Sequence, residues 1–195
     1  MIISASNIRQ YAKLRFNVTD IDIYIEEAQE YLKKKMNSDL YDRMLVVSTY
    51  SAWSNATAYT AGNYVTYSGS LWKCLVGNTN SAPTSVNTNW DEQDIYEGFL
   101  ILQKSLSYIA LSKMLIEHGI EIQADGLVKY SGAESQTAVS SDERAALVNK
   151  YQNKGDSVFT EFLTWIDDVS YLVDTVSYPF TSSDIRKNKT DFGIF

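Results

Sequence analysis

An abrupt change in composition along the chain is the feature that most constrains its fold. The segment from Ser51 to Asp91 is rich in Thr, Asn, Ser, Gly, Tyr and Trp, and its only charged residues are Lys73 and Asp91. The segments on both sides place apolar residues at helical spacing, whereas this one does not. The sequence therefore predicts a small all-β module inserted between helices.

The first helical part contains two adjoining helices. From Asp20 to Met36 the apolar residues form a single stripe, which is typical of an amphipathic helix with Thr19 as its N-cap. After a break at Asn37, a shorter helix runs from Ser38 to Leu45. We expect these two helices to form an αα-hairpin.

The second helical part contains two longer helices. Apolar residues from Asp94 to His118 occupy two faces, so we expect this helix to be central and buried on two sides. A short strand or loop is expected from Ile120 to Tyr130. A capping box at Ser140–Glu143 then opens a long helix through Leu172, which we expect Gly155 to bend.

The fold class predicted from these segments is mainly α, with a small all-β module inserted between helices. The helical body takes up residues 1–50 and 93–177, the β module residues 51–92, and an extended C-terminal tail residues 178–195. Within the module, Tyr64–Tyr67 and Leu71–Val76 are β-prone runs separated by Ser68, Gly69 and Ser70. This spacing predicts a β-hairpin, because glycine accepts the positive φ of a tight turn.

Composition argues against several classes of protein. The net charge of −7 and pI of about 4.7 disfavour binding to a phosphate backbone. Cys74 is the only cysteine, which excludes an intrachain disulfide and fits a reducing compartment. The first residues lack the apolar run of a signal peptide, and no segment is expected to span a membrane.

The sequence does not predict an enzyme, a metal site or a cofactor. The only histidine, His118, is expected to cap a helix C-terminus rather than to act as a base. Neighbouring carboxylates, as in Glu26–Glu27 and Asp167–Asp168, point about 100° apart on a helix and cannot share a ligand.

The β segment resembles small carbohydrate-binding modules of the chitin-binding type. The resemblance rests on the order of Tyr59, Gly62, Val65, Tyr67, Gly69 and Trp72, followed by Pro83 and Trp90. Most of these positions form the core of such modules, so the pattern argues for fold more than for ligand. The adjacent exposed tryptophans of sugar-binding members are replaced here by Leu75, Val76 and Gly77. Core packing is therefore favoured over glycan stacking for each aromatic candidate: Trp53, Tyr59, Tyr67, Trp72 and Trp90.

The flanking parts resemble the small head-to-tail connector proteins of tailed phages. The matching stretches are Asp20–Leu45, then Gly119–Val128, then Ser141–Glu143 with the last helix. The resemblance implies a homo-oligomeric ring, twelvefold in that family, in the neck of the virion. Its partners would be the portal protein and the next neck or tail ring, and DNA would pass through without specific binding. Such a protein would be made in the host cytoplasm.

Two functions follow as hypotheses: a structural neck ring protein without enzymatic activity, or a glycan-binding adhesion or decoration protein acting through the β module. In the first, aromatic and aliphatic residues of the C-terminal tail dock on a partner. These candidates are Tyr178, Phe180, Phe192, Ile194 and Phe195.

Overall fold

A computed structural model describes residues 1–12, 21–36, 38–117, 130–131, 135–136 and 141–169. Within these ranges 59% of the residues are helical, and a small sheet module lies in the middle of the chain. The mainly α fold class is therefore confirmed. His118 lies outside the described residues. The same holds for the tail from 178 to 195, which contains the five candidate docking residues.

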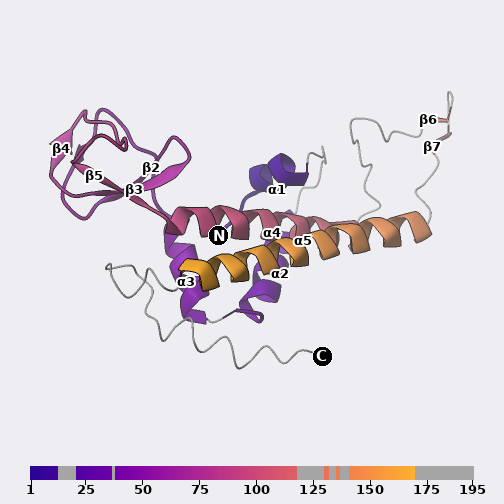
Figure 1. Cartoon of the computed structure of the whole chain (residues 1–195). Helices are drawn as coiled ribbons and strands as arrows, with labels where there is room; N and C mark the ends of the chain where they lie inside the picture. Colours follow the sequence, from indigo (N-terminus) through magenta and orange to yellow (C-terminus); the bar gives the residue numbers. More distant parts are fainter. Residues whose placement is uncertain (13–20, 37, 118–129, 132–134, 137–140, 170–195) are drawn as a thin grey trace.

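The body is helical, and the module projects from one end of it (Figure 1). The helices are α1 (Ala5–Ala12), α2 (Ile21–Lys33), α3 (Ser38–Val47), α4 (Ile95–Glu117) and α5 (Ser141–Val169). The strands of the module are β1 (Ala58–Tyr59), β2 (Tyr64–Tyr67), β3 (Ser70–Cys74), β4 (Asn78–Thr79) and β5 (Trp90–Gln93). A separate short pair is formed by β6 (Tyr130–Ser131) and β7 (Ser135–Gln136).

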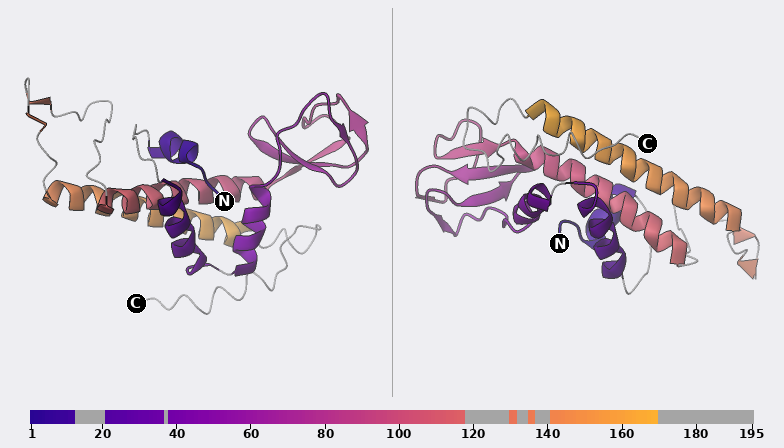
Figure 2. Two further views of the ribbon diagram at one scale, coloured as in Figure 1. Left: turned by 180° about the vertical axis from the view of Figure 1, so that it is seen from behind. Right: turned by 90° about the horizontal axis from the view of Figure 1, so that it is seen from below.

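Helix α4 is the centre of the body, as its two apolar faces predicted. It packs against α1, α2 and α5, and Figure 2 shows α5 running alongside it for most of its length. The pair is antiparallel, because Glu97 at one end of α4 meets Trp165 near the end of α5 while Ser112 meets Gln152. Leu102, Leu106 and Ile109 of α4 are completely buried.

Helix α4 also differs from what the sequence predicted. It is long and apolar enough, over Ile95–Ile116, to meet the criteria for a membrane-spanning helix, whereas no such segment was expected. However, 67% of that window is buried inside the protein. Most of this window of α4 is thus covered by the rest of the protein, and Ile116 at its end is 58% exposed.

The N-terminal segment is part of the core, which the sequence did not predict. Ile2, Ile3 and Ile8 are buried. The backbone of Ile2 is held on both sides, since its N–H donates to Gln29 Oε1 at 2.7 Å and its carbonyl accepts from Gln103 Nε2 at 2.9 Å. Helix α1 is short, and so it carries too few apolar positions for a periodic pattern to be recognised.

The β module contains the predicted hairpin. Strands β2 and β3 are antiparallel, with Tyr64 opposite Lys73 and Tyr67 opposite Ser70. Ser68 and Gly69 both have positive φ, 53° and 86°, which matches a two-residue type I′ turn. Strand β5, which the sequence did not predict, adds to β3 and makes a three-stranded sheet, while β1 pairs with β4.

Gly155 was expected to bend the last helix, but the structure gives it a packing role. It lies within the continuous helix α5, where a Cβ would come 2.5 Å from Ile109 Cγ1 and 3.3 Å from the Ile109 backbone nitrogen. Ser105 Oγ also donates to the Gly155 carbonyl at 2.8 Å. Glycine at this position therefore allows α4 and α5 to approach closely.

We predict that Gly155→Ala destabilises the protein. In an exposed helix this change would be favourable by about 1 kcal/mol. Here the added methyl group would crowd the fully buried side chain of Ile109, which costs about 1–3 kcal/mol. This cost exceeds the gain in helix propensity, so the free energy of unfolding falls. Urea unfolding followed by circular dichroism will measure the loss. The double variant Gly155→Ala/Ile109→Ala should lose less unfolding free energy than the two single variants lose together. Strictly additive losses would contradict the contact between the two residues.

Candidate functional site

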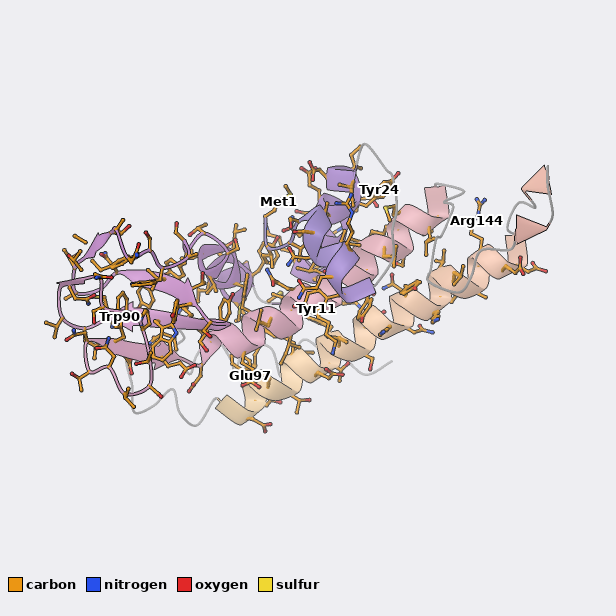
Figure 3. The ribbon with its side chains drawn as sticks, turned by 90° about the horizontal axis from the view of Figure 1, so that it is seen from above. Met1, Tyr11, Tyr24, Trp90, Glu97 and Arg144 are labelled. Atoms are coloured by element: carbon orange, nitrogen blue, oxygen red, sulfur yellow. The ribbon has the colours of Figure 1, made fainter. Side chains whose placement is uncertain are left out.

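Two groups of side chains are candidates for function: the aromatic residues of the β module and a polar cluster between the helices. The module has its own hydrophobic core, formed by Tyr59, Val65, Trp72, Cys74 and Trp90. Trp53 and Tyr67 pack against this core from outside. Figure 3 shows Trp90 among the side chains inside the module.

Three of the five candidate glycan-stacking residues lie inside the module. Tyr59, Trp72 and Trp90 are buried, and Tyr59 packs edge-to-face on Trp90 with ring centroids 5.3 Å apart. Their polar atoms already have partners. Trp90 Nε1 donates to the Ser81 carbonyl at 2.8 Å, and Trp72 Nε1 donates to the Tyr67 carbonyl at 3.3 Å.

The other two candidates, Trp53 and Tyr67, are partly exposed and form an edge-to-face pair with centroids 5.2 Å apart. Trp53 is positioned by its backbone, because its N–H donates to the Thr66 carbonyl at 2.9 Å beside β2. Its indole Nε1 is buried and has no hydrogen-bond partner among the described residues. This pair is therefore an aromatic surface that the described part of the module offers to a ligand.

The segment after β3 carries aliphatic side chains where sugar-binding members were expected to carry tryptophans. Leu75 and Val76 are 47% and 56% exposed. Cys74, just before them, is fully buried, and burial raises the pKa of its thiol. Cys74 is therefore a neutral, buried side chain rather than a reactive thiolate.

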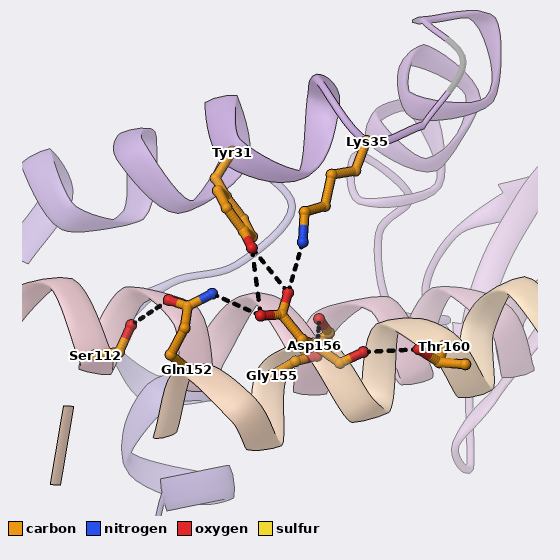
Figure 4. Close-up of polar contacts among 8 residues, drawn as sticks. Tyr31, Lys35, Ser112, Gln152, Gly155, Asp156 and Thr160 are labelled. Carbon is orange, nitrogen blue, oxygen red and sulfur yellow. Dashed lines mark hydrogen bonds and ion pairs between the residues drawn. The ribbon is translucent and has the colours of Figure 1, made fainter. Parts of the chain in front are cut away.

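The polar cluster joins α2, α4 and α5 around the carboxylate of Asp156 (Figure 4). Lys35 Nζ lies 2.9 Å from Asp156 Oδ1, and the Tyr31 hydroxyl donates to the same oxygen at 3.0 Å. Gln152 Nε2 donates to Oδ2 at 3.0 Å, and Ser112 Oγ donates to Gln152 Oε1 at 2.9 Å. We refer to these five residues as the Asp156 cluster.

The charges in the Asp156 cluster stabilise each other. Burial alone would raise the pKa of Asp156, but hydrogen bonds from Gln152, Lys35 and Tyr31 outweigh it, so the pKa is lowered. Burial would likewise lower the pKa of Lys35, but its contacts with Tyr31 and Asp156 raise it. A general acid or base works best with a pKa near the working pH, and both shifts lead away from it. The cluster is thus suited to holding helices together rather than to proton transfer.

Other side chains that could bind a metal or act as acids and bases do not come together in the described ranges. No group of three or more His, Cys, Asp or Glu side chains there is placed to hold a metal ion. Glu26, Glu27, Asp167 and Asp168 lie on exposed helix surface.

Two family models match the sequence. One, described as carbohydrate-binding module family 5/12, matches residues 52–94, which supports the resemblance of the inserted module. The other, described as a family of unknown function (DUF6712), matches residues 77–174. Comparison with curated proteins and with solved structures gave no match. Neither description names a reaction.

We predict that Asp156→Asn destabilises the protein by about 1 kcal/mol at neutral pH, since it removes a partly exposed ion pair together with its hydrogen bonds. Because the folded-state pKa lies below the usual value of 3.8, the carboxylate contributes stability above that value and loses it as the pH falls further. Chemical unfolding at several pH values should therefore show the difference between the wild type and the variant shrinking as the pH falls below about 4.

Glu161→Gln is the matched control. Glu161 pairs with Lys104 at 3.9 Å on the exposed surface, where such pairs contribute little. A loss for Glu161→Gln as large as that for Asp156→Asn would contradict a special role for the Asp156 cluster.

Proposed function

The chain belongs to the family of unknown function DUF6712, and from this premise we propose that it is a structural protein of a tailed-phage virion, a subunit of an oligomeric ring in the neck. In this role it links the portal and capsid to the tail and continues the DNA channel. Its partners are further copies of itself, the portal protein and the next neck or tail ring. It is made in the host cytoplasm and acts in the virion.

The observation that carries this proposal is the architecture of the helical body. Helices α2, α3 and α5, which include two of the stretches that resemble head-to-tail connectors, are joined into one body by contacts with α4. The Asp156 cluster adds polar links between α2, α4 and α5. A ring subunit needs such a body, because it presents broad surfaces to its neighbours on both sides.

Charge gives the proposal further support. The net charge of −7 suits a channel through which DNA slides, because a surface of like charge does not retain the phosphate backbone. The carboxylate of Asp156 is engaged in contacts between the helices, since it accepts from Tyr31 and Gln152 and pairs with Lys35. A protein that acts by assembly needs such contacts to keep its body rigid.

We predict that the purified protein forms rings, alone or with its portal protein. Light scattering will give the mass, and negative-stain microscopy the symmetry. A protein that stays monomeric and does not bind the portal would contradict the proposal.

The tail can be tested in the same assay. Deleting residues 182–195 should weaken docking to the portal or to the next ring while leaving the circular dichroism spectrum of the body in place. A matched control keeps the length of the tail but changes Phe192, Ile194 and Phe195 to Ser. Both variants should lose binding if the apolar side chains dock, and unchanged assembly would contradict a role for the tail.

A second candidate function is glycan binding by the β module, which the match to carbohydrate-binding module family 5/12 favours. The partly exposed pair Trp53 and Tyr67 would then contact the sugar. We predict that Tyr67→Ala abolishes retention on chitin or host polysaccharide in a pull-down assay. Val86→Ala is the control, since Val86 is 88% exposed in the same module. Failure of the wild-type protein to bind either polymer would exclude this function.

A further inference from the structure

A pocket lies at the junction between the β module and the helical body. Its volume is about 290 Å³, and it is formed by the N-terminal segment with α1, the end of α3, strand β2 and the first turns of α4. Met1, which marks the N-terminal segment in Figure 3, lies between the module and α1. The lining residues are Met1, Ile2, Ile3, Ser4, Asn7, Val47, Ser48, Tyr50, Thr66, Tyr96, Phe99 and Gln103.

None of the residues lining the pocket carries a charged side chain, yet several are polar. The structure gives no partner within the described ranges to the hydroxyls of Tyr50, Thr66 and Tyr96. Asn7 Oδ1 accepts from the Ser4 N–H at 2.8 Å, which leaves its NH₂ group free to donate. Gln103 donates to the Ile2 carbonyl at 2.9 Å, which leaves its Oε1 free to accept. The side chains of the pocket therefore offer both donors and acceptors without a charge, and the α-amino group of Met1 adds one positive charge to the lining.

Two aromatic pairs flank these polar groups. Tyr50 stacks on Tyr64 with centroids 5.0 Å apart, and Tyr96 stacks on Phe99 at 5.6 Å. Burial raises the pKa of Tyr50 and of Tyr96, so both hydroxyls keep their protons and can donate at ordinary pH. The stacking partners hold both phenol rings in place.

We infer that this junction pocket binds a neutral, polyhydroxylated ligand, with room for about one sugar ring. Its volume lies near the lower end of the range of about 300–1,000 Å³ usual for small-molecule sites. Sugar hydroxyls both donate and accept, which matches the mixed groups of the wall.

The residues that line the pocket disfavour other classes of ligand. A cationic ligand would find no counter-charge here, because the charged group among the lining residues is the positive α-amino group of Met1. A purely apolar ligand would leave the free hydroxyls and amides without partners. The site is distinct from the aromatic pair of the module, because neither Trp53 nor Tyr67 lines it. It is independent of the neck role proposed above.

The test is saturation-transfer difference NMR on the full chain with four neutral sugars: glucose, galactose, mannose and N-acetylglucosamine. We expect at least one sugar to bind, with an affinity that does not change between 50 and 500 mM NaCl, because a neutral sugar forms no ion pair with the lining. The double variant Thr66→Val/Tyr96→Phe removes two hydroxyls and keeps the shape of the wall. It should weaken binding about tenfold or more, since each lost hydrogen bond contributes about 1 kcal/mol.

The control is Thr57→Val, which makes the same change at an exposed position of the module. It should bind as the wild type does, and circular dichroism will show that all variants are folded. Three results would overturn the inference: no binding of any of the four sugars, equal binding by the double variant, or binding that is lost in Tyr67→Ala but kept in the double variant. The last result would place the sugar on the module instead.

Discussion

The close packing of α4 on α5 is the interaction on which the rest of this structure depends. Helix α4 supplies most of the fully buried side chains of the body, and its other faces carry α1 and α2. The short distance at Gly155 lets Ile109 pack directly against the backbone of α5 and lets Ser105 bond to a backbone carbonyl there. A larger residue at position 155 would separate the helices and weaken every contact that α4 makes on that side.

Polar contacts fix the orientation of α2 relative to the α4–α5 pair. Apolar packing is not directional, so it permits several rotations of α2 on α4. The Asp156 cluster removes this freedom, because Tyr31 of α2 and Lys35, which follows α2, must both reach one carboxylate of α5. Its two charges are only partly buried, so they retain some hydration and cost less than a fully buried ion pair would.

The sequence was sufficient to predict the features that depend on local periodicity and on turn chemistry. The apolar stripe of α2, the two-sided burial of α4 and the Ser68–Gly69 turn all follow from side chains close together in the chain. Features that depend on contacts across the chain were not predicted. Strand β5 has only four residues and owes its place to β3, and α1 is held by side chains far away in sequence, such as Tyr108, whose hydroxyl donates to the Tyr11 carbonyl. The role of Gly155 was missed for the same reason, since its partner Ile109 lies on another helix.

The candidate site was predictable in part. The aromatic pattern indicated the β module correctly, but a pattern cannot tell which of its rings face inwards. The junction pocket has no sequence signature, because its walls come from four separate segments.

The connection between the module and the body has a mechanical consequence. A single residue, Asp94, separates the last residue of β5 from the first residue of α4. No linker is present there to absorb a displacement, so the sheet and the core helix act as one lever. A force applied to the module is therefore transmitted to α4 and resisted by shear between α4 and α5, the most extensive contact between the described helices.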